Sequence, residues 1–182
     1  MKLLNWVANR RLRAFERRWN YDAAYAHAIV DEAGAAAAMP LAALQKLGSY
    51  KKIPLNAYYG ATLTAGKQAD CGPCLQLAVA MAEHDGVAPE VIRAILGGGE
   101  LPDDARLGVE LARSTIARDL RAEPAREEIL RRWGRRGLVS LAYGIVAAQA
   151  YPAFKYAMGY GHACARVRVA GQDLPLQTAV AR

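Results

Sequence analysis

Apolar residues recur along most of this chain at intervals of three and four, the spacing of one face of an α-helix. The spacing is clearest at the start, where arginines separate the apolar positions and predict an amphipathic helix over residues 2–20. Its apolar stripe consists of Leu4, Ala8, Leu12, Phe15 and Trp19. We expect this stripe to pack on the rest of the protein or on a neighbouring subunit. An exposed stripe would instead favour contact with a membrane or another anionic surface.

Boundary residues divide the rest of the chain into further helices. Asp70 can cap a helix that begins at Cys71, and Gly86 ends the same helix after about Asp85. Prolines at the start of segments fit the first helical turn, where their missing N–H costs little. The other predicted helices cover 21–38, part of 40–54, 55–67, a short segment from Pro89, 102–116, 124–136, 138–150 and a segment that Pro152 begins or bends.

Small residues and the tail complete this prediction of the fold. In the helix over 55–67, small residues allow another helix to approach closely: Ala57, Gly60, Ala61 and Ala65. The tail over 166–182 alternates at Val167 and Val169 and contains Gly171 and Pro175, so we expect it to be extended or irregular. Strands and helices do not alternate, which argues against a parallel sheet. The predicted fold class is all-α.

Composition agrees with a helical globular protein. The chain has 182 residues, 53% of them apolar, and alanine supplies much of that share. This excludes a disordered chain, a collagen-like chain and a disulfide-stapled miniprotein. The length predicts one domain or one domain with extensions. We expect a basic helical extension over 1–39, a helical domain over 40–165 and an extended tail over 166–182.

Charge is concentrated in one segment. The formal net charge is +7, but the first twenty residues hold six cations and one acid, Glu16. The remainder is nearly neutral, with 18 cations and 16 acids, which argues against a nucleic-acid binder. This imbalance predicts a role for the segment in assembly or surface attachment rather than in thiol chemistry.

Polar and charged residues interrupt every apolar segment that could serve as a membrane span or a signal peptide. No stretch approaches 18 uninterrupted apolar residues, and Asn5, Asn9 and the arginines break up any signal-peptide core. We therefore expect a cytoplasmic protein. Inside a cell, a close pair of cysteines indicates redox or metal chemistry rather than a structural disulfide.

That pair lies in Asp70-Cys71-Gly72-Pro73-Cys74, at the predicted start of a helix. Thiols three residues apart are within reach of a disulfide, and the positive end of a helix favours a thiolate. As the first helical residue, Cys71 is expected to be the more exposed thiol and Cys74 the more buried one. Redox cycling is the interpretation we prefer.

Two other interpretations of the pair stay open: inert packing, and half of a zinc site. Zinc would need a second pair of ligands, and His162 with Cys164 is the one close pair among the remaining cysteines and histidines, which include His27 and His84. The tetrapeptide is also that of thioredoxins, but there it follows a strand and a tryptophan. Asp70 precedes it here, among helices.

Two neighbouring segments resemble the alkylhydroperoxidase-D-like, carboxymuconolactone decarboxylase superfamily. The first is residues 69–78, which hold the cysteine pair. The second is Glu83 to Ile92, which includes Gly86-Val87-Ala88-Pro89-Glu90. The resemblance spans roughly residues 40–165. It implies an alkylhydroperoxidase-D-like helical bundle, a homo-oligomer and a peroxidase cycle. In this cycle the second cysteine is implicated in attack on peroxide and the first in resolution. It implies no metal, flavin or haem cofactor, and an external dithiol as reductant.

The chain departs from the redox-active members of that family at two positions. Ala78 and Tyr59 stand where those members have a histidine and a glutamate that relay protons. Without this relay, peroxide turnover should be slow and thiol–disulfide exchange less affected. The polar residues that we consider as auxiliary groups are Tyr59, Gln76, His84 and His162.

The function predicted from the sequence is a thiol-dependent oxidoreductase, acting on peroxide or by disulfide exchange through Cys71 and Cys74. One alternative is a non-catalytic helical binding or assembly protein of the same fold. Another is a protein associated with a membrane surface or with nucleic acid through its basic first helix.

Overall fold

Eight α-helices contain most of the residues described by this computed structural model, which are 2–119, 123–163 and 165–176. The model thereby confirms the all-α class. The helices are α1 (Lys2–Trp19), α2 (Ala24–Ala28), α3 (Ala35–Ser49), α4 (Leu55–Gln68), α5 (Gly72–His84), α6 (Pro89–Gly97), α7 (Asp103–Ala117) and α8 (Glu123–Ala157). A π-helical turn, η1 (Ile29–Ala33), continues α2.

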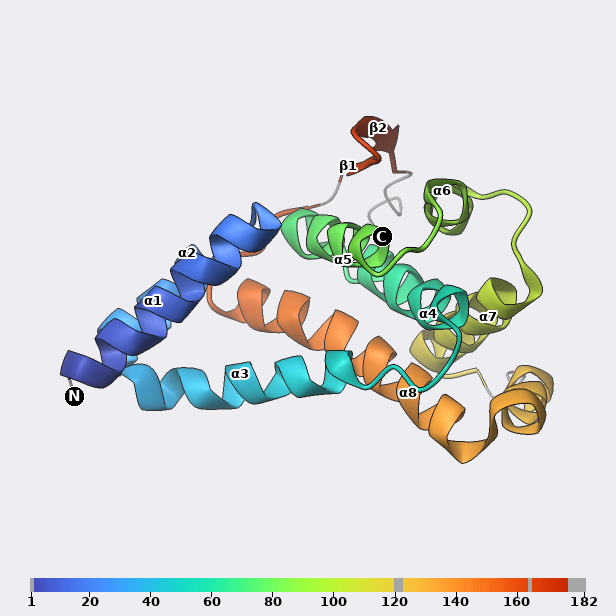
Figure 1. Cartoon of the computed structure of the whole chain (residues 1–182), viewed down its shortest axis with the longest axis horizontal. Helices are drawn as coiled ribbons and strands as arrows, with labels where there is room; N and C mark the ends of the chain where they lie inside the picture. Colours follow the sequence, from blue (N-terminus) through green and yellow to red (C-terminus); the bar gives the residue numbers. More distant parts are fainter. Residues whose placement is uncertain (1, 120–122, 164, 177–182) are drawn as a thin grey trace.

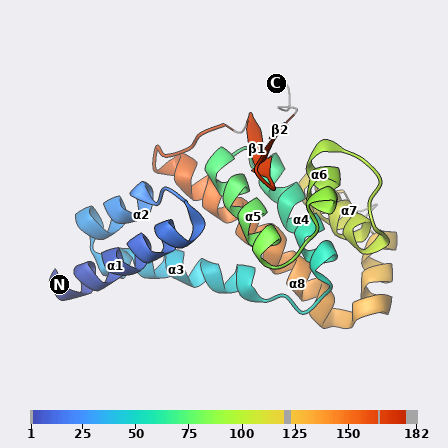
Figure 2. The same cartoon turned by 45° about the horizontal axis from the view of Figure 1, so that its top comes forward.

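Helix α4 lies at the centre of the main body, between α5, α7 and α8 (Figures 1 and 2). Its small residues bring it against α7, as the sequence predicts. A Cβ atom on Gly60 would lie 2.5 Å from the Ala105 carbonyl oxygen, and one on Gly108 would lie 2.1 Å from that of Ala57. Both separations are shorter than real contacts allow, so these two glycines are required for the backbones to approach this closely.

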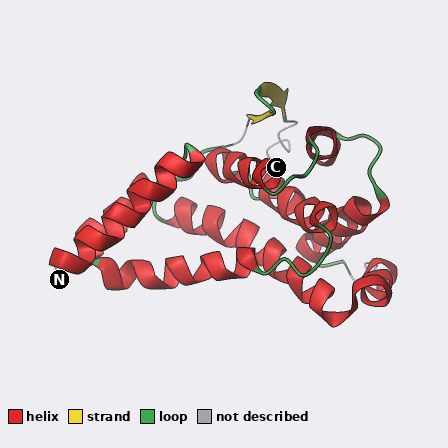
Figure 3. Ribbon diagram, in the orientation of Figure 1, coloured by secondary structure: helices red, strands yellow, loops and turns green. Residues whose placement is uncertain are grey.

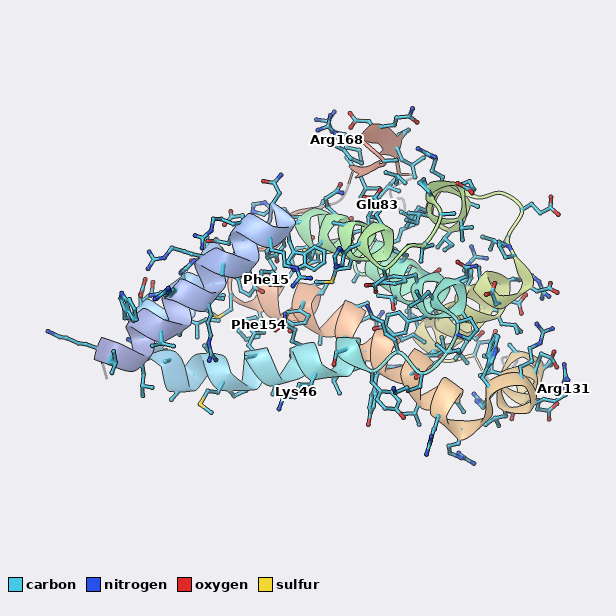
Figure 4. The ribbon with its side chains drawn as sticks, viewed as in Figure 1. Phe15, Lys46, Glu83, Arg131, Phe154 and Arg168 are labelled. Carbon is cyan, nitrogen blue, oxygen red and sulfur yellow. The ribbon has the colours of Figure 1, made fainter. Side chains whose placement is uncertain are left out.

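The helices α1, α2 and α3 form an arm that extends from the body towards the N-terminus (Figure 1). Three residues of the predicted apolar stripe of α1, Leu12, Phe15 and Trp19, pack on a cluster shared with α2 and α3, whereas Leu4 is exposed. Phe154 of α8 packs on the same cluster, and Figure 4 labels it beside Phe15 of the arm. The arm is therefore joined to the body by a common apolar core.

Three predicted helix boundaries differ from the structure. The predicted helix over 21–38 ends instead at Gly34, whose φ of 89° is in the left-handed region that favours glycine. Helix α3 then continues through Pro40, whose ring removes one hydrogen bond to the carbonyl of the exposed Ala36. Pro152 neither begins nor ends a helix, because α8 continues through it.

The predicted helices over 124–136 and 138–150 are joined in α8 by a kink at Gly134, where φ is 64° and ψ is −171°. Among the described residues, α8 is the one helix long and apolar enough to cross a membrane by length and composition. Core helices of soluble proteins pass the same test.

The tail forms a short antiparallel hairpin, β1 (Arg166–Val169) and β2 (Gln172–Pro175), shown in yellow in Figure 3. Ala170 and Gly171 form its two-residue turn, both with positive φ, as a type I′ hairpin turn requires. Strands β1 and β2 are extended, and residues 177–182 of the predicted tail lie outside the described residues.

Candidate functional site

The turn between α4 and α5 places both cysteines at one end of α5. Asp70 adopts a left-handed φ of 48°, and Cys71, rather than Asp70, occupies the position before the first helical residue. The end of α8 and the segment after it hold this turn in place: the Gly72 N–H donates to the His162 carbonyl at 2.9 Å, and the Tyr156 hydroxyl donates to the Asp70 carbonyl at 2.8 Å.

The sulfur atoms of Cys71 and Cys74 lie 2.7 Å apart, longer than an S–S bond of about 2.05 Å, and both cysteines are free thiols. Cys71 has no exposed surface, whereas Cys74 is half-buried. The expectation that Cys71 is the more exposed thiol is therefore wrong. The physical reason is that the turn is hydrogen-bonded on either side of Cys71, at Asp70 to Tyr156 of α8 and at Gly72 to His162 after that helix.

The pair is polarised, with one thiolate and one thiol. The hydrogen bond with the Cys74 side chain lowers the pKa of Cys71 to about 6, although burial opposes this. The backbone of Cys74, the charge of Lys155 and the backbone of His162 lower it further. The pKa of Cys74 is raised, first by its hydrogen bond with Cys71 and then by burial. Cys71 is therefore the more acidic thiol of the pair, and Cys74 holds the proton that the two sulfurs share.

A buried lysine lies beside this pair. Lys155, in the last turns of α8, is 3% exposed, and its Nζ lies 3.4 Å from the Tyr21 hydroxyl. The same nitrogen lies 5.3 Å from the ring centre of Tyr21 and 5.1 Å from that of Tyr25. Both distances fit cation–π contacts. Lys155 is the one buried charged residue in the described part of the chain.

Two tyrosines of the arm complete the surroundings of the cysteines. Burial raises the pKa of Tyr21 far above its ordinary value, and raises that of Tyr25 to about 12. Both hydroxyls are therefore protonated at neutral pH and can donate hydrogen bonds. One such bond, from Tyr21, lowers the pKa of Cys74 against the larger effects that raise it. The segment over 1–39 thus contributes side chains to the thiol site.

Of the auxiliary residues predicted from the sequence, Tyr59 lies in a different polar cluster. Its hydroxyl donates to Asp85 Oδ2 at 2.5 Å, and it accepts from Lys51 Nζ at 2.8 Å. Asp85 follows the last residue of α5, whereas the cysteines lie at the first turn. A 13-residue helix is about 20 Å long. Tyr59 is therefore separated from the thiols by the length of α5.

The other three auxiliary residues have different contacts. Gln76 anchors the hairpin: its side chain accepts from the Arg168 N–H at 2.7 Å and donates to the Arg168 carbonyl at 3.0 Å. The His84 ring lies 5.3 Å from that of Trp19, at the far end of α5. His162 reaches the thiol site through its backbone, and its side chain is exposed.

The described residues offer no group of three His, Cys, Asp or Glu side chains that could hold a metal ion. Cys164, part of the possible second zinc-ligand pair, lies outside the described residues. A hollow of about 420 Å³ is lined by Gln76 and by residues of the hairpin, including Arg168 and Asp173. It lies beside the hairpin, on the side of α5 that anchors it, and its lining includes neither cysteine.

Sequence reasoning missed Lys155, Tyr21 and Tyr25. A signal for the lysine is present, since it is the one Lys, Arg, Asp or Glu between Gly137 and Ala163. A lone charge in so apolar a helix is expensive to bury without a partner. The two tyrosines have no comparable signal, because their place beside the cysteines depends on how the arm packs.

Comparison with protein-family models, with curated proteins and with solved structures finds no match to this chain.

Proposed function

We propose that this protein is a dithiol–disulfide oxidoreductase that cycles between the reduced Cys71–Cys74 pair and its disulfide. The observation that supports this most directly is the 2.7 Å separation of two free thiols at a helix start. The lowered pKa of Cys71, about 6, supplies a thiolate at neutral pH. Inert packing would require neither this separation nor a charge beside it.

The difference in burial assigns different roles to the two sulfurs. In the oxidised protein, the thiolate of an external dithiol attacks the half-buried Cys74 Sγ and forms a mixed disulfide. The Cys71–Cys74 bond breaks, and its electron pair leaves on Cys71 as a thiolate. The second thiol of the reductant then attacks the mixed disulfide, releases Cys74 and gives it a proton. Cys71 suits this role because thiols of low pKa leave faster.

The reverse direction oxidises the pair. Cys74 gives its proton to the Cys71 thiolate and attacks a small-molecule disulfide, which releases one thiolate. Cys71 then attacks the mixed disulfide on Cys74, its proton passes to the departing second thiolate, and the internal disulfide forms. With Ala78 at the position of the family's relay histidine, we expect exchange with disulfides to be faster than turnover of peroxide.

The finer fold assignment is part of this proposal. The order of α4, α5 with the thiols at its start, the short α6, α7 and the long α8 supports an alkylhydroperoxidase-D-like bundle. A homo-oligomer and a cytoplasmic location are proposed with it. Exposed apolar side chains on α8, Tyr143 and Val146 among them, support contact with a second copy. The mass of the protein in solution tests that contact.

The central experiment treats the reduced protein with glutathione disulfide and counts free thiols under denaturing conditions. We expect two thiols to disappear together without a covalent dimer, and to return with dithiothreitol. The matched control is Cys164→Ser, which should behave as the wild type. If Cys71 and Cys74 both remain titratable after oxidation, the non-catalytic binding or assembly protein is the better interpretation.

We propose a second role for the outer face of α1, namely binding to an anionic lipid surface. Although most of the predicted stripe packs inward, Leu3, Leu4 and Trp6 are 72%, 66% and 52% exposed. The cations Arg10, Arg13 and Arg17 are also exposed. Glu16, the one acid of the helix, is turned towards α2 of the arm, where its carboxylate accepts from the Ala23 N–H and contacts His27. The outer face therefore combines apolar side chains with uncompensated positive charge.

Co-sedimentation with vesicles tests this second role. We expect binding to vesicles that contain phosphatidylserine and much weaker binding to phosphatidylcholine alone. Reversal of Arg10, Arg13 and Arg17 to glutamate should abolish it, whereas the same reversal at Arg131 and Arg135, on exposed positions of α8, should not. Equal loss in both sets, or no binding by the wild type, would contradict the role. A change of mass in solution on reversal of the α1 charges would indicate a contact between copies instead.

A further inference from the structure

Lys155 lacks the partner that a buried ammonium group normally has. Among the described residues, no carboxylate forms an ion pair with it, although it is 3% exposed. Its recorded side-chain contacts are the Tyr21 hydroxyl and the faces of Tyr21 and Tyr25. Tyrosine faces and one hydroxyl offset part of the cost of burying this charge, but they carry no negative charge themselves. An anion nearby would complete the site.

We propose that Lys155 is a positioning residue whose charge stabilises the Cys71 thiolate. Tyr156, the next residue of α8, donates to the carbonyl of Asp70, which directly precedes Cys71. Lys155 Nζ lies 3.4 Å from the oxygen of Tyr21, and the Cys74 sulfur lies 2.7 Å from that of Cys71. The buried cation and a buried thiolate compensate each other's burial. The charge of Lys155 is also one of the causes that lower the pKa of Cys71.

This inference rests on the proposed thiol–disulfide cycle and adds a consequence to it. Lys155 stabilises the reduced protein, in which Cys71 is charged, and not the disulfide, which has no charge. A stabilised thiolate makes the disulfide easier to reduce and so makes the protein a better oxidant. It also makes Cys71 a better leaving group when a reductant attacks Cys74. In this site a lysine and a tyrosine stand beside thiols that lack the family's histidine and glutamate.

The arm positions Tyr21 beside Lys155. Tyr21 follows α1 directly, and its N–H donates to the Glu16 carbonyl at 3.2 Å. Its ring meets that of Phe15 edge to face, with centres 5.8 Å apart. Tyr21 is therefore fixed by the amphipathic helix, while Lys155 is fixed by α8. The thiol site depends on the packing of the arm against the body.

The test compares Lys155→Met, Lys155→Arg and Tyr21→Phe with the wild type in the full chain. Thiolate absorbance at 240 nm against pH gives the midpoint of Cys71 ionisation. We expect Lys155→Met to raise this midpoint by about one pH unit, the low end of what an opposite charge supplies. Tyr21→Phe keeps the aromatic face but removes the hydroxyl, so it should raise the midpoint by less. Lys155→Arg keeps the charge and should stay close to the wild type.

The second readout is the equilibrium of the protein disulfide with glutathione at pH 8. A midpoint raised by one unit makes reduction of the disulfide up to about tenfold less favourable there. The matched control is Lys46→Met, which removes a charge from the exposed outer side of α3, where Figure 4 labels it. It should change neither readout. If Lys155→Met does not fold, Lys155→Gln replaces it in both measurements, because glutamine removes the charge but keeps a polar group at the end of the side chain.

The outcomes separate this inference from the proposed function. A wild type that forms no reversible disulfide would overturn the cycle, yet the midpoint would still show whether Lys155 stabilises the thiolate. A reversible disulfide with the same midpoint and equilibrium in the wild type and in the folded Lys155→Met or Lys155→Gln variant would overturn the role of Lys155 alone. A shift in both readouts with Lys155→Met, largely reversed in Lys155→Arg, supports it.

Discussion

The two ends of α5 each bring a lysine and a tyrosine together, but the third partner differs. At the C-terminal end, Lys51 Nζ pairs with the carboxylate of Asp85 and donates to Tyr59. At the N-terminal end, Lys155 meets Tyr21 and the thiol pair, with no carboxylate in ion-pair contact among the described residues. The first cluster has its charges balanced by residues that are ionised at neutral pH. The second is balanced only when a thiol ionises.

This difference explains why one cluster suits structure and the other chemistry. A carboxylate paired with a lysine stays ionised from mild acid upward, so the Lys51–Asp85 pair is constant at physiological pH. A thiol has an unperturbed pKa near 8.5, so a nearby cation moves its ionisation into the physiological range. The same two residue types therefore stabilise the fold at one end of α5 and favour a reactive group at the other.

The largest test of this comparison is Cys71→Ser. We expect it to abolish the internal disulfide completely and to remove the thiolate transition near pH 6. Cys74 should then ionise at lower pH than in the wild type, because the hydrogen bond with Cys71 is the first cause of its raised pKa. Thiol counting after oxidation and absorbance at 240 nm measure these effects. A transition near pH 6 that survives in this variant would assign the low pKa to another group.

The two clusters should also give stability in different pH ranges. The pKa of Cys71 is lower in the folded protein than the value near 8.5 of an unfolded thiol. Its contribution to the free energy of unfolding is therefore complete above about pH 8.5 and is lost as the pH falls towards 6. The pKa of Asp85 is also lowered, against the effect of burial, by hydrogen bonds from Lys51 and Tyr59. Its contribution is present above about pH 4 and is lost in stronger acid.

Urea unfolding of the reduced protein checks these two ranges. The difference in unfolding free energy between the wild type and Cys71→Ser should shrink from pH 9 to pH 6. The difference between the wild type and Asp85→Asn should be constant there and shrink only below about pH 4. If the free-energy differences for Cys71→Ser and Asp85→Asn depend on pH in the same way, the two clusters are not electrostatically distinct.

Replacement of Lys51 or Lys155 by methionine should change the free energy of unfolding by different amounts in the two clusters. Lys51→Met leaves the half-buried Asp85 charged without its cation, so we expect a loss of about 1–2 kcal/mol. Lys155→Met leaves Cys71 able to take up a proton and become neutral, so unfolding free energy at pH 7 should change little. Denaturant unfolding with dithiothreitol present measures both. A larger loss in Lys155→Met than in Lys51→Met would show that Lys155 is chiefly structural.

The smallest effect is expected for Tyr59→Phe. The change removes one hydrogen bond to Asp85 and should cost about 1 kcal/mol of unfolding free energy. It should leave the ionisation midpoint of Cys71 unchanged, because the length of α5 separates the two. Tyr21→Phe, its counterpart in the thiol cluster, should raise that midpoint. A shift of the midpoint in Tyr59→Phe would show that the clusters are coupled through α5.

Much of the helical fold could be predicted because local signals were strong. Periodic apolar residues located α1, α4, α5, α6 and α7, and small residues located the close contact of α4 with α7. The errors occurred where two signals competed. Pro40 suggested a helix boundary, but the left-handed Gly34 provides the actual one, and a proline near a helix start loses only one hydrogen bond.

The candidate site was predictable only in its local part. Cys71 and Cys74 are three residues apart, so any helix start brings them together. Their relative burial was not predictable, because it depends on His162 and the segment after α8. Lys155 and Tyr21 come from opposite ends of the chain, and no periodicity relates them. Tyr59 showed the converse: its place in the sequence suggested the thiol site, but its contacts lie elsewhere.

The contact between Tyr21 and Lys155 joins residues 134 positions apart, and this affects the order of events during folding. Closure of so long a loop is slow relative to formation of local helices, so α4 and α5 can form before the arm meets α8. During that interval the two cysteines lack their tyrosine and lysine neighbours and behave as ordinary thiols. On the ribosome, the interval lasts at least until residue 155 has emerged. Thiol reactivity near pH 6 then signals that the whole chain has folded, and a nascent chain is less exposed to oxidation at these cysteines than the finished protein.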